Sequence, residues 1–177
     1  TQNAILENAD SLFPAVALER VWQEFNKMSD YPHFGHALAE LHRLRLLPNI
    51  FPELTNAHLN DIRHYGQIID RFPLETPTIL KLAELFPQEP LESLILIFKN
   101  LKTSNLDLTT LEFARNSQRQ IFSYPENLSP VDWVQFYAHP MADLALILES
   151  QRTYHEQPSV FLAPHQQRKH ALKPHIE

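Results

Sequence analysis

The chain has 177 residues, with 15 Lys and Arg against 21 Asp and Glu, so its formal net charge at pH 7 is −6. That length allows one sizeable domain or two small ones. The negative balance argues against a protein that binds polyanions over its whole surface, although it permits a local basic face. The absence of cysteine excludes disulfides, thiolate zinc sites and cysteine nucleophiles.

The chain contains only two glycines but fourteen prolines, a balance that favours helices. Few glycines leave few positive-φ turns for β-hairpins, and the prolines fall between apolar-periodic stretches, where they end or begin helices. We therefore predict an all-α fold, a multi-helix array or bundle of about eight to ten short helices without a sheet. We expect a cytoplasmic protein without membrane contact, because the chain shows no leader and no run of about 18 apolar residues. Because it begins with Thr1, we expect a piece of a longer chain or a processed product.

The stretch 14–54, which we call the hub, predicts two amphipathic helices followed by a short apolar anchor, and we expect the rest of the chain to pack around it. Its first half carries five apolar residues on one face of a helix, namely Leu18, Val21, Trp22, Phe25 and Met28. Pro14 suits the first turn of this helix, and Pro32 follows its end. A second helix carries Leu38, Leu41 and Leu44, reaches Leu46-Leu47 and stops at Pro48, and residues 51–54 form a short apolar anchor.

Further helices are predicted over 55–73, 78–86, 91–101 and 106–121, and another begins after Ser129 as cap and Pro130 in the first turn. Gly66, inside the first of these, costs roughly 1 kcal/mol relative to alanine, and close packing against a neighbour would explain it. From Tyr154 the chain becomes polar and histidine-rich, so we expect a weakly packed tail. We predict three regions, residues 1–54, 55–153 and 154–177.

Three phrases in the hub occur in a fixed order: Leu18-Glu19-Arg20, then the leucine-rich helix 37–47, then Phe51-Pro52-Glu53-Leu54. Their order and spacing resemble the segment after the catalytic head in bacterial tRNA nucleotidyltransferases and poly(A) polymerases. One position departs, because the family usually has a glycine before the closing Leu-Leu and Arg45 stands there. The resemblance implies neck-like helices over 1–54, a helical RNA-binding body over 55–153 and a tail.

The resemblance implies a helical RNA-binding portion of an RNA 3′-end nucleotidyltransferase, which holds tRNA or another RNA 3′ end for a head absent from this chain. Magnesium and ATP or CTP would belong to that head. The chain itself lacks the Asp-x-Asp pair that shares two metal ions and every Gly-rich phosphate loop. We therefore expect no catalytic residue and no metal ligand here, although the parent family consists of transferases that act in tRNA and RNA processing.

The candidate site residues form small groups. The neck-like motif comprises Glu19, Arg20 and Glu24, which either brace the neck or form an ordinary solvated helix face. The candidates for RNA backbone contacts are Lys99, Lys102, Arg115, Arg119, Arg43 and Arg45, with Arg168, Lys169 and Lys173 as a tail group. Contacts of this kind would be sensitive to salt and largely independent of sequence.

Two other functional hypotheses remain open. A helical protein-interaction module would use an exposed apolar groove and show no RNA affinity. A metal-dependent hydrolase would bring histidines and aspartates to one cavity, but the His-Asp dipeptide is absent, and the ten histidines are most simply structural or solvated. Trp22 and Phe25 are expected in the core rather than as a platform for stacking bases.

Overall fold

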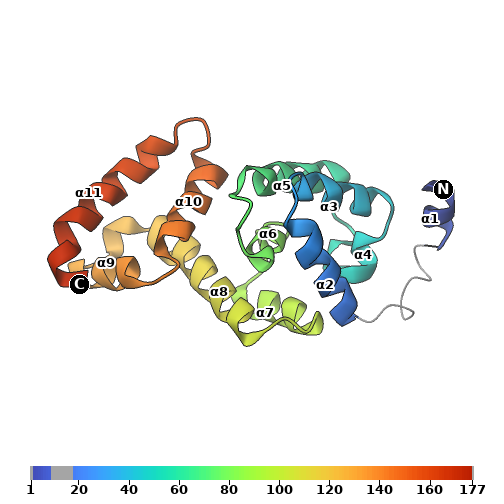
Figure 1. Cartoon of the computed structure of the whole chain (residues 1–177), viewed down its shortest axis with the longest axis horizontal. Coiled ribbons are helices and arrows are strands. Elements are labelled where there is room, and N and C mark those ends of the chain that lie inside the picture. The colour runs from blue at the N-terminus through green and yellow to red at the C-terminus, as the bar shows by residue number, and fades with distance from the viewer. Residues whose placement is uncertain (1, 9–17, 177) are drawn as a thin grey trace. The chain divides into compact units, whose positions relative to one another are not determined.

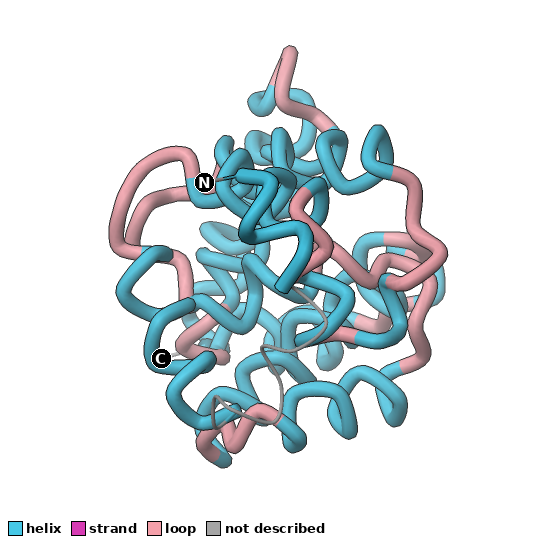
Figure 2. Tube along the Cα trace, turned by 90° about the vertical axis from the view of Figure 1, so that its right-hand side faces the viewer, coloured by secondary structure: helices cyan, strands magenta, loops and turns pink. Residues whose placement is uncertain are grey.

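The computed structural model describes residues 2–8 and 18–176, and within them the predicted all-α class is confirmed. These residues form eleven α-helices, the short 3-10 turns η2 and η4 and one π-helical segment, η3, and none of them lies in a strand (Figures 1 and 2). No helix in the described ranges is long and apolar enough to cross a membrane. Pro14, predicted in a first helical turn, lies outside the described residues.

The chain divides into two compact units after Leu108. The three functional regions expected from the sequence, 1–54, 55–153 and 154–177, stay a prediction. The helices on either side of residue 54 pack closely on each other, and the last helix packs on the two before it. Helix α8 (Asn105–Asn116) carries the chain from the first unit into the second. The other elements up to Leu108 are α1 (Gln2–Asn8), α2 (Leu18–Ser29), α3 (Phe34–Arg43), α4 (Leu47–Ile50), η2 (Pro52–Leu54), α5 (Leu59–Arg71), α6 (Thr78–Ala83) and α7 (Leu91–Asn100).

Phe51 lies at the centre of the core of the first unit. It is 1% exposed, and its ring centroid is 6.0 Å from that of Phe25, 5.2 Å from that of Phe86 and 6.3 Å from that of Phe98. Aromatic rings at these separations add to the burial of their apolar area. Trp22 packs edge-on against Phe98 and is also buried. The predicted anchor at 51–54 and the core placement of Trp22 and Phe25 are confirmed.

Helix α3 ends at Arg43, earlier than predicted, because the chain turns there through a left-handed residue. Arg45 has φ 61°, and the N–H of Leu46 donates to the carbonyl of Leu41 at 2.9 Å. This six-residue hydrogen bond around a left-handed position is the Schellman ending of a helix, which usually uses glycine. Arg45 thus occupies the position where the resembled family has its glycine. Pro48, predicted to stop this helix, instead lies in the first turn of α4.

The second unit contains η3 (Ser117–Phe122), η4 (Pro125–Asn127), α9 (Pro130–Ala138), α10 (Ala142–Thr153) and α11 (Pro158–Ile176). The predicted cap of α9 is confirmed as a capping box, in which Asp132 donates its N–H to the Ser129 hydroxyl and its carboxylate accepts the Ser129 N–H. The expected weakly packed tail is wrong. Residues 158–176 form α11, which packs on α9 and α10.

His165 explains why the histidine-rich tail is ordered. It is 7% exposed, lies beside the rings of Trp133 and Phe161, and shares a 2.8 Å hydrogen bond between its Nδ1 and the Tyr137 hydroxyl. Burial, together with the neighbouring Arg168 guanidinium, lowers the pKa of His165 to about 4. This histidine is therefore a neutral core residue at pH 7.

Candidate nucleic-acid interface

The two glycines of the chain face each other where α3 and α5 cross. A Cβ atom on Gly35 would lie 1.9 Å from the carbonyl oxygen of Gly66, and one on Gly66 would lie 2.5 Å from the carbonyl oxygen of Gly35. Both distances are too short for any side chain, so the two backbones touch directly. The close packing predicted for Gly66 is confirmed. Figure 1 shows α3 and α5 side by side.

Asp70, near the end of α5, caps the beginning of α3. Its Oδ1 accepts the N–H of Gly35 at 2.7 Å and its Oδ2 accepts the N–H of His36 at 3.2 Å. At the other end of α3, the His42 ring nitrogen Nε2 is 2.8 Å from the carbonyl oxygen of Ala57, just before α5. The two helices are therefore antiparallel. Because the carboxylate of Asp70 satisfies two backbone donors, its negative charge is directed to the start of α3.

Polar side chains follow this crossing along both helices, and we call them the α3–α5 seam. On α3 and α5 they recur at i, i+4 and i+7, which keeps each set on one helical face. The seam consists of His36, Glu40 and Arg43 on α3, with Arg63, Gln67 and Asp70 on α5.

The charges of the seam are arranged around Glu40. Arg43 donates to the Glu40 carboxylate at 3.0 Å through Nε and lies 2.9 Å from it through the terminal nitrogen NH2. This hydrogen bond is the largest cause of the lowered pKa of Glu40; desolvation opposes it, and the nearby charges of Arg43, His36 and Arg63 lower the pKa further. Glu40 is thus paired with Arg43, and Arg63 on α5 is exposed to solvent.

A hollow of about 180 Å³ lies over the glycine crossing. Its walls are His36, Arg63, Gln67 and Asp70, and its floor includes Gly35, Ala39 and Gly66. Arg63 and Gln67 are exposed, and neither side chain has a hydrogen bond within the described ranges. The hollow therefore offers one guanidinium and one amide that are available to a ligand. The residues of its floor have small side chains or none, so they do not block the approach of a ligand.

The sequence-predicted cations are distributed over both units. Arg43 belongs to the seam, and Arg45 is exposed directly after α3. Lys99 and Lys102 are exposed at the end of α7 in the first unit, and Lys102 also has a left-handed φ of 60°. Arg115 and Arg119 lie in the second unit.

Arg115 is only 5% exposed, so its guanidinium has little surface to give to a phosphate. Of the tail group, Lys169 forms an ion pair with Asp143 at 2.7 Å, and Arg168 lies 4.1 Å above the Trp133 ring. These contacts hold α11 to its own unit.

The neck-like motif lies on the exposed face of α2. The side chains of Glu19, Arg20 and Glu24 all face solvent, and Glu24 forms an ion pair with Lys27 at 2.8 Å. This exposed i, i+3 pair is worth only a few tenths of a kcal/mol, about 0.2–0.5.

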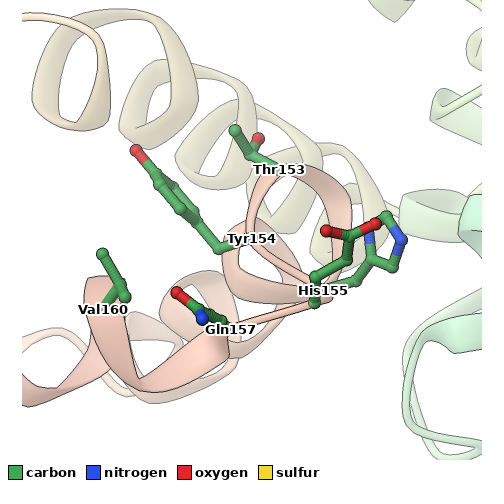
Figure 3. Close-up of a pocket in the computed structure, with 6 residues that line it drawn as sticks. Thr153, Tyr154, His155, Gln157 and Val160 are labelled. Carbon is green, nitrogen blue, oxygen red and sulfur yellow. The ribbon is translucent and has the colours of Figure 1, made fainter.

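Another hollow, of about 240 Å³, lies at the turn between α10 and α11 (Figure 3). Tyr154 and His155 point away from each other in it, and Glu156 adds a carboxylate. Its lining holds no lysine or arginine, so it offers a nucleic-acid backbone no permanent positive charge. Among the described residues, no three His, Asp or Glu side chains come together as metal ligands do.

A family model described as "probable RNA and SrmB-binding site of polymerase A" matches residues 1–58. This part of the chain is similar to an RNA-binding region of polymerase A. The match covers α2, α3 and α4, and ends just before α5. No curated protein and no solved structure matches the chain.

Arg63, Gln67 and His36 were not among the site residues predicted from the sequence. Arg63 and Gln67 lie four residues apart within the helix predicted over 55–73, so their spacing was visible in the sequence. What the sequence alone did not show is that α5 packs on α3 with Arg63 near Glu40. The available signal was the pair of glycines. They are the only two in the chain, so a contact between them could have been considered when Gly66 was found inside a helix.

Proposed function

We propose that the first unit binds RNA through the α3–α5 seam and through Arg45, which follows α3. The observation that carries this proposal is the family match over residues 1–58, which includes α3 with Arg43 and Arg45. Arg63 of α5 extends the same surface beyond the matched residues. Guanidinium groups suit this role because they bind phosphate oxygens through paired hydrogen bonds.

In the finer form of the proposal, the chain is the RNA-holding part of an RNA 3′-end nucleotidyltransferase of the poly(A) polymerase or tRNA nucleotidyltransferase type. It would hold tRNA or another RNA 3′ end for a catalytic head outside these 177 residues. That head would use magnesium with ATP or CTP. The order of Leu18-Glu19-Arg20, the leucine-rich α3 and Phe51-Pro52-Glu53-Leu54 supports this assignment.

The experiment measures the affinity of the full 177-residue chain for a labelled RNA with an unpaired 3′ end, by fluorescence anisotropy at several salt concentrations. Each lost phosphate contact to a single strand reduces the slope of log K against log salt by about 0.7. We expect Arg63→Gln and Arg43→Gln each to reduce the affinity and the slope. Lys27→Gln, which removes one positive charge from α2, is the matched control and should leave both nearly unchanged.

Two outcomes contradict the proposal. Absence of RNA binding at low salt rejects RNA binding by this chain on its own. Binding that Lys27→Gln weakens as much as Arg63→Gln does would show that overall charge, and not the seam, determines affinity.

The description of the matching family names SrmB beside RNA, and this favours protein binding as a second candidate function. A helical protein-interaction module would bind its partner without a steep dependence on salt. The same anisotropy assay with the labelled partner protein, repeated across the salt series, separates this function from RNA binding.

A further inference from the structure

We propose that the hollow over the Gly35–Gly66 crossing is a subsite for one unpaired nucleotide of a single-stranded RNA. Its phosphate would bind Arg63 and the edge of its base would bind Gln67. This inference rests on the proposed RNA-binding function and adds which form of RNA the seam selects.

The size of the hollow favours a small part of a larger ligand. At about 180 Å³, it is smaller than the roughly 300–1,000 Å³ clefts that enclose drug-sized ligands. One planar base is a group of the right scale. The absence of Cβ atoms at Gly35 and Gly66 lets the two backbones touch, so backbone atoms rather than side chains form the floor of the hollow.

The chemistry of the walls favours a base over a bare phosphate. A phosphate accepts hydrogen bonds but, as a dianion or diester, has no donor to offer. Gln67 presents both a donor and an acceptor, and the Asp70 carboxylate at the same wall disfavours an anion beside it. Base edges carry donors and acceptors together, so Gln67 and Asp70 match a base while Arg63 matches its phosphate.

The geometry also favours a single strand over a duplex. In A-form RNA the Watson–Crick edges are paired and the bases are stacked, so none can enter a hollow between two helices. An unpaired nucleotide can turn its base out of the strand at the cost of its own stacking alone. The seam outside the hollow, with Arg43, would contact neighbouring phosphates of either form.

The test compares three forms of the full chain, the wild type, Gln67→Leu and Gln23→Leu. Gln67→Leu keeps the side-chain size but removes the amide, and Gln23→Leu makes the same change at an exposed site on α2. Each is titrated with a labelled single-stranded 12-mer RNA and with an RNA duplex of equal length. We expect the wild type to prefer the single strand, and Gln67→Leu to lose about fivefold to tenfold of that affinity with an unchanged salt slope and unchanged duplex binding.

A second measurement locates the base directly. Amide NMR shifts of the 15N-labelled chain are followed during titration with each of the four nucleoside monophosphates, and residues 35–36 and 63–67 should shift most. Equal binding of single strand and duplex, or full single-strand affinity in Gln67→Leu, overturns the subsite while leaving RNA binding by the seam intact. Loss of all RNA binding in every form overturns the proposed function itself, so the two failures are distinguishable.

Discussion

Gly35 and Gly66 lie so close that a Cβ atom on either would collide with the carbonyl oxygen of the other. Direct backbone contact of this kind brings α3 and α5 together, and with them the polar faces that form the seam. The only two glycines of the chain are therefore used for helix packing and not for turns. This arrangement has measurable consequences for stability.

Replacement of Gly66 by alanine should destabilise the first unit. Alanine favours a helix by about 1 kcal/mol over glycine, but the added methyl would lie 2.5 Å from a backbone oxygen that cannot swing away. We expect a net loss of about 2 kcal/mol or more in the free energy of unfolding, measured by denaturant titration. Asn60→Ala, at an exposed position of the same helix, is the control and should be neutral or stabilising; an equal loss there would refute the explanation by contact.

Arg45 and Lys102 should each be less favourable than glycine at their positions. Both have a left-handed backbone, where a Cβ atom costs about 1 kcal/mol. The Arg45→Gly variant should therefore be more stable than the Arg45→Ala variant by about that amount. Likewise, Lys102→Gly should be more stable than Lys102→Ala. If Arg45 contacts RNA, Arg45→Gly will gain stability and lose RNA affinity together. Equal stability of the glycine and alanine variants would show that the left-handed conformation carries no strain.

Lys81 should stabilise the first unit although it is a buried cation. Its side chain is 2% exposed, and its Nζ donates to the carbonyl oxygens of Ser29 and Leu74, each at 2.8 Å. Burial lowers its pKa, and nearby carboxylates oppose that effect. Lys81→Met keeps the chain length but leaves both carbonyls without this donor, so we expect a loss of about 1–3 kcal/mol in unfolding free energy. Lys99→Met, on the exposed face of α7, should change stability little.

The second unit should lose stability as the pH falls from 6.5 to 4. His165 has a folded pKa of about 4 against an ordinary value of 6.5, so the unfolded chain binds its proton first. The contribution of neutral His165 to the free energy of unfolding is complete above pH 6.5 and is lost below about pH 4. The total change is no more than about 3 kcal/mol. Hydrogen exchange of α9 and α11 amides measures this separately from the first unit. His165→Gln keeps a polar partner for Tyr137 but does not titrate, so the stability of the second unit should depend less on pH in this variant. An unchanged pH profile would show that other groups cause the pH dependence.

Much of the fold followed from local patterns in the sequence. The apolar spacing of α2, the Ser129 cap and the anchor at Phe51 each depend on residues within a few positions of one another, and all three were predicted. Close packing at Gly66 was also anticipated, because a glycine in a helix interior needs a compensating contact. The identity of its partner, Gly35, was not.

What could not be predicted depends on which helices meet. His165 resembles a solvated tail histidine until α11 is placed on α9, where Tyr137 becomes its partner. Arg115 resembles a surface cation until its burial is known. The seam required the antiparallel packing of α3 and α5, which no local pattern specifies.

The cap that Asp70 provides to α3 has a consequence for where this protein can be divided. The family match ends at residue 58, but the carboxylate that completes the start of α3 lies twelve residues further on. A polypeptide cut at residue 58 would lose both this cap and the glycine against which Gly35 packs. The end of the family match and the end of the contacts that complete α3 therefore fall at different places in this chain, because Gly66 and Asp70 lie beyond the matched residues.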